Sequence, residues 1–258
     1  MTTTHYAIIA ISLVLGSLLL TLTSQAPSAD DLEETVQTVG ADTEFAYEID
    51  PTDFLQGDKL IASEPSTDLS EAEISDLLYM REEEKLARDV YLALGRRWNI
   101  QTFSNIANSE QTHTDSVLRL IERYGLTDPA STEEGVFSNE TLQKLYDDLL
   151  AEGSESRTAA LTVGARIEDL DIMDLDTAIN RTDNEDIALV YGNLRRSSEN
   201  HLRAFNRQLV RETGENYVPE FISTEEFEAI ISSTSGQGMG GNGKNGDSRG
   251  MGGGNGNR

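Results

Sequence analysis

The chain has 258 residues, enough for one substantial domain with appendages. Its 46 Asp and Glu residues outnumber its 20 Lys and Arg residues, and the formal net charge of −26 would repel the phosphate backbone of a nucleic acid. The sequence contains no cysteine, which excludes disulfides, iron–sulfur clusters and thiolate ligands. We therefore expect no nucleic-acid partner, and any bound metal ion would have to use nitrogen and oxygen ligands.

The N-terminal residues 1–26 predict a signal peptide or an N-terminal membrane anchor. An uncharged, largely apolar run over residues 6–22 precedes Ser24-Gln25-Ala26, which resembles the small-x-small pattern of a cleavage site. Residues 1–5 contain no Lys or Arg, and the apolar run is near the short limit for a membrane span, so an uncleaved anchor stays open. Both alternatives predict export to a secreted, periplasmic or cell-surface location, with membrane contact only through this segment.

The remaining chain divides by composition into three parts. Residues 27–68 are acidic and irregular, which indicates a linker, and residues 233–258 are rich in Gly and Asn, which is typical of a disordered tail. Residues 69–232 carry the helical signals. We predict four main helices, over about 70–95, 102–125, 155–171 and 186–210, with a separate helical segment at 174–180, an accessory helix at 139–151 and a C-terminal mini-helix starting at Ser223 or Thr224.

Each predicted main helix carries polar groups in the middle of its apolar face. On the helical period, Glu84 interrupts the first stripe, Glu110 and His113 the second, Glu168 the third and His201 the fourth. A bare carboxylate in a helical core is strongly unfavourable, so these groups must share protons, pair with cations or bind metal.

Three other interpretations of these residues remain open from the sequence. Glu84 lies in an acidic run that could be a solvated face paired with Arg81 and Arg88. Glu168 could belong to a solvated acidic turn, because Asp169 and Asp171 lie beside it. His201 could be a hydrogen-bonded core imidazole.

Several local motifs resemble known ferritin-like proteins. The string from Glu84 to Tyr91 (EKLARDVY) is similar to the first helix of rubrerythrin-type proteins. The stretches at 79–91, 103–107, 109–113 and 200–205 resemble the uncharacterised ferritin-like family catalogued as domain of unknown function 2202, over roughly residues 69–231. This resemblance implies an all-α fold: a ferritin-like antiparallel four-helix bundle with a short accessory helix and a C-terminal extension.

The resemblance also implies a metal site in the core of the bundle. Ferritin-like carboxylate proteins take a Glu from each of two helices and a Glu-x-x-His motif from each of the other two. Carried onto this chain, the metal ligands are Glu84, Glu110, His113, Glu168 and His201. Tyr91, Ser198 and Asn200 are then expected to line the site or to support its ligands.

One departure from this pattern affects the expected metal content. The last motif has Ser198 where the pattern has Glu, so the set loses a carboxylate. Three carboxylates and two imidazoles suit a single iron or manganese ion, or an asymmetric pair completed by water or Asn200. We therefore expect fewer than two tightly held ions.

The sequence supports two functions. The first is an exported redox metalloprotein that uses iron or manganese and reacts with oxygen or peroxide. If it is an enzyme, it is a non-haem iron or manganese oxidoreductase. The second is a non-catalytic secreted or cell-surface helical module whose inward polar residues form a structural hydrogen-bonded network. The catalytic residues and the substrate are not indicated, and a homodimer is left open.

Overall fold

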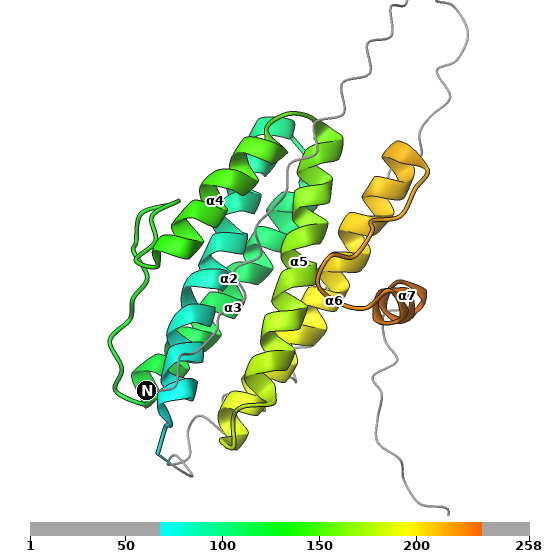
Figure 1. Ribbon diagram of the computed structural model, residues 1–258. Helices are drawn as coiled ribbons and strands as arrows, with labels where there is room; N and C mark the ends of the chain where they lie inside the picture. The colour runs from blue at the N-terminus through cyan, green and yellow to red at the C-terminus, as the bar shows by residue number, and fades with distance from the viewer. Residues whose placement is uncertain (1–67, 234–258) are drawn as a thin grey trace, which may run out of the picture. The chain divides into compact units, whose positions relative to one another are not determined.

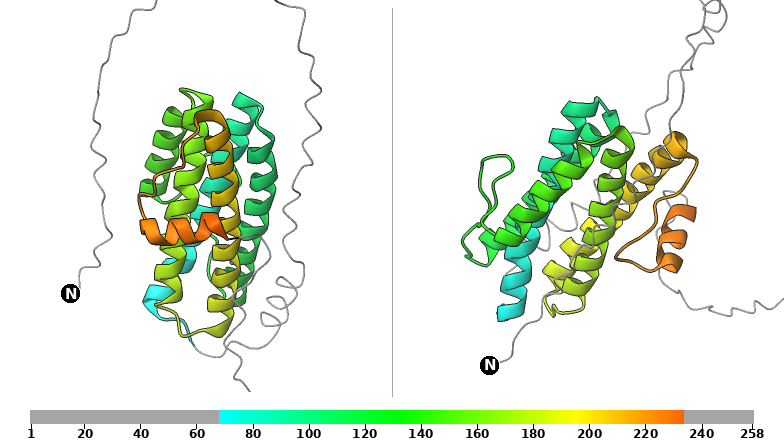
Figure 2. Two further views of the ribbon diagram at one scale, coloured as in Figure 1. Left: turned by 90° about the vertical axis from the view of Figure 1, so that its right-hand side faces the viewer. Right: turned by 45° about the horizontal axis from the view of Figure 1, so that its top comes forward.

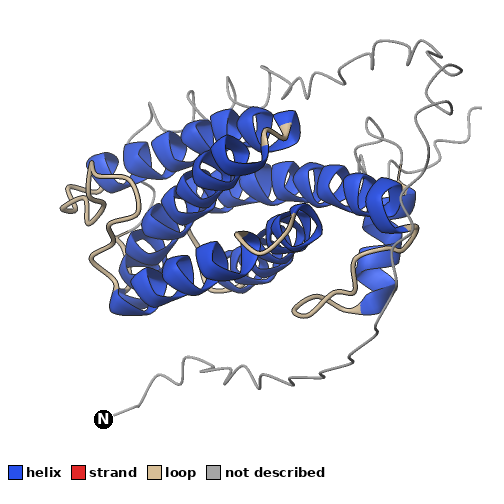
Figure 3. Cartoon of the chain, turned by 90° about the horizontal axis from the view of Figure 1, so that it is seen from above, coloured by secondary structure: helices blue, strands red, loops and turns tan. Residues whose placement is uncertain are grey.

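The computed structural model describes residues 68–233, which form six helices and contain no strand (Figures 1 and 3). The prediction of an all-α fold is confirmed for this range. The segments predicted as leader (1–26), linker (27–68) and tail (233–258) lie outside the described residues, except for residues 68 and 233. None of the described helices combines the length and apolarity that a membrane span needs. The helices are α2 (Glu71–Trp98), α3 (Gln101–Arg123), α4 (Glu140–Gly153), α5 (Arg157–Ile179), α6 (Glu185–Thr213) and α7 (Thr224–Ser232).

The four long helices α2, α3, α5 and α6 lie side by side (Figures 1 and 2). The most extensive contacts join α2 to α3 and α5 to α6, and α2 also contacts α5 while α3 contacts α6. The shorter α4 packs against α2 and α5, and α7 lies across the long axis of α6 (Figure 2). All four long helices therefore face one shared interior.

The ends of α2 show how the sequence starts and stops a helix. At the beginning, the Ser70 hydroxyl accepts a hydrogen bond from the Glu73 N–H, and the Glu73 carboxylate accepts one from the Ser70 N–H, which is a capping box. At the end, Asn99 adopts a left-handed conformation with φ of 51°. Only Asn99 and Ile100 separate α2 from α3, so the two helices form an antiparallel hairpin.

Two predicted boundaries were wrong. The predicted break between residues 171 and 174 does not exist, because α5 continues from Arg157 to Ile179. Asp171 is buried there rather than part of a solvated turn, so the acidic residues do not end the helix. For α3, the sequence predicts a cap at Thr102 or Ser104, but both residues lie inside the helix, which begins after Ile100 without a side-chain cap.

Two apolar clusters divide the interior along the helices. One contains the C-terminal half of α2 and the N-terminal half of α3, and its aromatic centre is formed by Tyr91, Phe103 and Phe205, whose ring centroids lie 5.1 to 5.7 Å apart. A Cβ atom at Gly164 would lie 2.5 Å from the Phe205 ring, so this helical position requires glycine. The second cluster contains the opposite halves, including Leu77, Val117, Leu120 and Ile121. The predicted polar positions on α2, α3 and α6 fall between the two clusters, whereas Glu168 on α5 lies within the stretch of the first.

Candidate metal centre

The five predicted ligands come from four helices and meet at one level of the interior. Nδ1 of His113 lies 2.8 Å from Glu110 Oε2 and 3.2 Å from Glu84 Oε2. Nδ1 of His201 lies 2.8 Å from Glu110 Oε1 and 3.4 Å from Glu168 Oε2. None of the five is more than 2% exposed. We call these five residues the centre; that they bind metal stays a prediction.

The donor atoms of the centre form two overlapping triads. One consists of Glu84, Glu110 and His113, and the other of Glu110, Glu168 and His201. In each triad, one ligand atom per residue lies within 4.8 Å of the other two. Glu110 belongs to both, and the two imidazole rings stack with centroids 5.5 Å apart. This arrangement offers mixed nitrogen and oxygen donors around two adjacent points.

Helical spacing explains why these side chains face inward. Glu110 and His113 are three residues apart in α3 and so lie on the same face of the helix. The solvated alternatives for Glu84 and Glu168 were wrong, because each side chain is 1% exposed. Of the two arginines proposed to pair with Glu84 on such a face, Arg81 instead binds Asp128 and Arg88 binds Asp89.

The structure places the three predicted supporting residues differently from one another. The Tyr91 hydroxyl donates to Glu168 Oε1 at 2.5 Å, so it holds one candidate ligand. The Ser198 hydroxyl donates to Asp171, and Asn200 is partly exposed and accepts a hydrogen bond from Arg203.

Two serines near His201 were missed by the sequence analysis. The hydroxyls of Ser109 and Ser197 lie 3.1 and 3.3 Å from Nε2 of His201, on the side of the ring opposite the carboxylates. Such contacts fix the orientation of a metal-binding imidazole. Their signal in the sequence is weak, although each serine lies four residues before a centre histidine.

Burial and neighbouring charges shift the pKa values of the centre strongly. Burial raises the pKa of Glu84 to about 8, against the opposing effect of His113. Burial acts in the same direction on Glu110, but the two imidazoles outweigh it and hold the pKa of that carboxyl below its usual range. Burial would lower the pKa of both histidines, but the adjacent carboxylates raise it, to about 9 for His201. Without a metal ion, Glu84 and the two histidines therefore retain protons near neutral pH, whereas Glu110 is ionised.

The oxygen atoms of the centre are not all used by hydrogen bonds. Among residues 68–233, Glu84 Oε1 is buried and has no hydrogen-bond partner. Asp171 Oδ1, beside the centre, is also buried and has no hydrogen-bond partner in this range. Buried polar atoms are normally satisfied, and a cation satisfies carboxylate oxygens for which the protein provides no donor. The residues present therefore fit a metal ion.

Asp171 is a neighbour of the centre that the sequence analysis did not single out as a site residue. Its side chain is 5% exposed and lies on α5, one helical turn after Glu168. Burial, followed by the charges of Glu84 and Glu168, raises its pKa well above the usual value. No feature of the local sequence distinguishes it from the exposed acids of this chain.

Comparison with known proteins places the chain in a family. Residues 73–234 match the family described as "Uncharacterized protein domain (DUF2202)". An uncharacterized protein, MJ0754 of Methanocaldococcus jannaschii, is 54% identical over 180 residues, which span 69% of this chain and 97% of that protein. The crystal structure of hypothetical protein MJ0754 from Methanococcus jannaschii is similar with a TM-score of 0.65 and 54% identity, and the match covers 67% of this chain and 99% of that one. The chain therefore belongs to the DUF2202 family of uncharacterized protein domains.

Proposed function

We propose that the protein is a ferritin-like redox metalloprotein that binds iron or manganese between its four long helices. In this proposal α2, α3, α5 and α6 form an antiparallel four-helix bundle, and the centre supplies its ligands. The observation that carries the proposal is the position of Glu110, whose two oxygens each lie 2.8 Å from a different histidine Nδ1. A carboxylate shared in this way between two donor sets is suited to bridge two adjacent metal positions.

The donor types favour iron or manganese. Carboxylates suit manganese and other hard divalent ions, whereas imidazole suits iron and several later metals. The centre combines three carboxylates with two imidazoles and has no thiolate, since the chain lacks cysteine. When bound, such an ion would supply redox chemistry towards oxygen or peroxide.

The residues around the centre support such a role. Tyr91 orients Glu168 by a hydrogen bond, and Ser109 and Ser197 orient His201. The apolar clusters restrict the access of water from both ends of the helices. Export is part of the same proposal and depends on the apolar run at residues 6–22.

A second candidate function is a non-catalytic helical module in which the same residues form a structural network. The observation that favours it is the complete set of contacts around His201, whose Nδ1 faces two carboxylates and whose Nε2 faces two hydroxyls. A protonated imidazole would be satisfied there without any ion.

Metal content separates the two functions. The full-length protein is incubated anaerobically with Fe²⁺ or with Mn²⁺, desalted and analysed for metal, beside a His113→Ala/His201→Ala variant. We expect at least one retained ion per chain in the wild type and a loss of retention in the variant, with helical content by circular dichroism unchanged. A wild type that retains neither metal supports the structural network and ends the redox proposal.

A further inference from the structure

The side chain of Asp171 lies beside Ser198, the position at which the centre lacks a ligand. Position 198 on α6 would hold a carboxylate in a Glu-x-x-His motif, but the serine there is too short to replace it. Instead, the Ser198 hydroxyl donates to Asp171 Oδ2 at 2.5 Å. The Asp171 carboxylate, from α5, is thus held directly beside position 198, where the carboxylate of the Glu-x-x-His motif is missing.

The other carboxylate oxygen of Asp171 makes no hydrogen bond within the described residues. Oδ1 is buried and has no hydrogen-bond partner among residues 68–233. The charged groups that act on Asp171 most strongly are Glu84, then Glu168 and Glu110, all of them members of the centre. Asp171 therefore lies next to the centre, and the charge of Glu84 acts on it more strongly than those of the other centre carboxylates.

The cations on neighbouring parts of α2 and α6 are engaged elsewhere. Lys85 pairs with Asp89, and Arg195 pairs with Asp176 and Glu226. A buried carboxylate oxygen without a donor is unfavourable, and a metal ion at the adjacent triad would remove that penalty.

We propose that Asp171, positioned by Ser198, is a further metal ligand that replaces the carboxylate missing at position 198. Asp171 would join the triad of Glu84, Glu110 and His113. Each of the two carboxylate oxygens of Glu110 then has enough other protein ligands beside it to hold an ion, and the centre binds two ions rather than one. Asp171 lies outside both triads, so its side chain must turn towards Glu84 to bind. This inference rests on the proposed function, because it assigns ligands within the same centre.

A titration with Mn²⁺ tests the assignment, with unbound Mn²⁺ followed by its electron paramagnetic resonance signal. The full-length wild type is compared with Asp171→Asn, which keeps the shape of the side chain, and with Asp174→Asn as a matched control. Asp174 lies three residues further along α5, where its carboxyl interacts with Glu83 and Tyr79. We expect two bound ions in the wild type and in the control, and one in Asp171→Asn.

Two further variants examine the role of position 198. Ser198→Ala removes the hydroxyl that holds Asp171, and we expect it to weaken the second ion by about tenfold or more, as is typical when a ligand loses its supporting hydrogen bond. The double variant Asp171→Asn/Ser198→Glu moves the carboxylate to α6, and we expect it to bind two ions again. Recovery in the double variant also shows that Asp171→Asn has not lost its ion through misfolding.

The possible results separate this inference from the proposed function. An Asp171→Asn protein that binds as many ions as the wild type overturns the assignment of Asp171 alone. Equal losses in Asp171→Asn and Asp174→Asn overturn it as well, because the effect would then reflect the acidic surroundings. A wild type that binds no Mn²⁺ and no Fe²⁺ overturns both the assignment and the proposed metal centre.

Discussion

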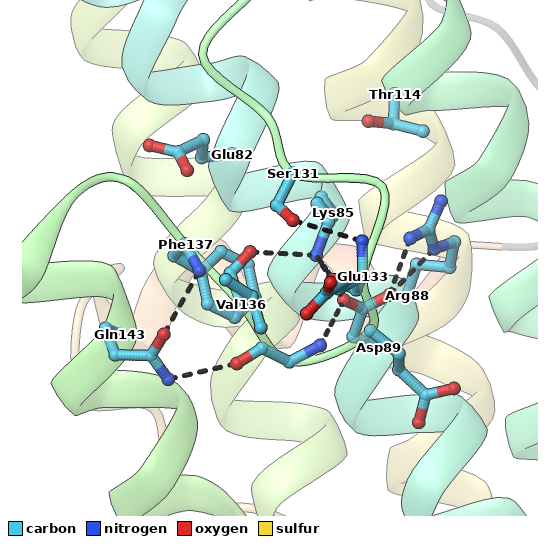
Figure 4. Close-up of polar contacts among 12 residues, drawn as sticks. Glu82, Lys85, Arg88, Asp89, Thr114, Ser131, Glu133, Val136, Phe137 and Gln143 are labelled. Atoms are coloured by element: carbon cyan, nitrogen blue, oxygen red, sulfur yellow. Dashed lines mark hydrogen bonds and ion pairs between the residues drawn. The ribbon is translucent and has the colours of Figure 1, made fainter.

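Two of the regions in which helix α2 buries charged residues differ in how far the protein itself balances them. The first region is the loop network, formed by Glu82, Lys85 and Asp89 with the loop that precedes α4 (Figure 4). Lys85 donates to Asp89 at 2.6 Å and to the backbone carbonyls of Glu133 at 2.9 Å and Val136 at 3.2 Å. The ammonium group therefore uses all three of its donors.

The carboxylates of the loop network likewise accept hydrogen bonds from several donors. Asp89 accepts from the Gly135 N–H at 2.9 Å as well as from Arg88, and Glu82 accepts from the backbone N–H groups of Ser138 and Asn139. In the centre, by contrast, Glu84 has an oxygen without a hydrogen-bond partner, although it is as deeply buried as Glu82. Burial of charge does not by itself indicate a site. An unpartnered buried acceptor indicates one only where other ligand atoms lie around it, as they do around Glu84.

Two adjacent acids on α5 also belong to different regions. Asp169 accepts hydrogen bonds from the Tyr217 hydroxyl and from the backbone N–H groups of Glu220, Phe221 and Ile222. It anchors the segment between α6 and α7. Its neighbour Glu168 faces the opposite way, towards His201 and Tyr91.

The largest effect should follow from breaking the ion pair of the loop network. Lys85→Met leaves Asp89 with Arg88 as its remaining cation and leaves the carbonyls of Glu133 and Val136 without this donor. We expect a loss of about 3–5 kcal/mol in the free energy of unfolding. Urea denaturation measures this loss. Metal retention should be unchanged in the variant under conditions where it is folded. A loss below about 1 kcal/mol would show that the network is not essential to the fold.

A somewhat smaller effect is expected when metal is removed from the centre. An ion that binds only the folded protein at 100 times its dissociation constant adds about 2.7 kcal/mol of stability. Chelation should therefore lower the melting temperature near neutral pH. His113→Ala should abolish most of the difference between the chelated and loaded protein, while its helical content stays the same.

The stability of the chelated protein should fall as the pH rises. Glu84 has a raised folded-state pKa of about 8 and His201 one of about 9, so the folded protein holds protons that the unfolded chain releases from about pH 4.5 and 6.5, respectively. Their contribution is complete below those lower values and is lost as the pH rises through 8 and 9. Metal binding displaces these protons, so the melting temperature gained from metal should increase between pH 6 and 9. Melting curves across this range, with and without chelator, would contradict the account if the gain decreased.

The smallest effects are expected from a matched pair of substitutions. Glu82 and Glu84 are the same residue type, lie two positions apart and are at most 2% exposed. Glu82→Gln weakens charge-assisted hydrogen bonds to the loop, and we expect it to cost about 1–3 kcal/mol without changing metal retention. Glu84→Gln should impair metal retention while leaving the chelated protein at least as stable as the wild type. Reversal of these two outcomes would contradict the comparison.

The sequence predicted the centre better than it predicted its surroundings. The helical period places residues three and four apart on one face, so the inward stripes of Glu84, Glu110 and His113 could be derived before any contact was known. The burial of Glu82 and Glu83 could not, because α2 contacts α3, α4 and α5 and buries more than one face. The role of Asp171 depends on a hydrogen bond from another helix, which no local pattern indicates.

The same limit applies to the boundaries of the helices. The capping box of Ser70 and Glu73 is a local interaction and marks the start of α2 in the sequence. The continuity of α5 through Asp171 is decided by packing against α2 and α6, so the acidic stretch was misread as a turn.

Anomalous X-ray scattering from crystals grown with Mn²⁺ or Fe²⁺ tests the central claim most directly. Data collected on either side of the metal's absorption edge locate the ion without reference to its assumed ligands. The account predicts an anomalous peak between Glu110 and a centre histidine, within about 2.0–2.3 Å of the ligand atoms. The account would be contradicted if crystals grown with the metal showed no peak there and Glu110 still contacted both imidazoles directly.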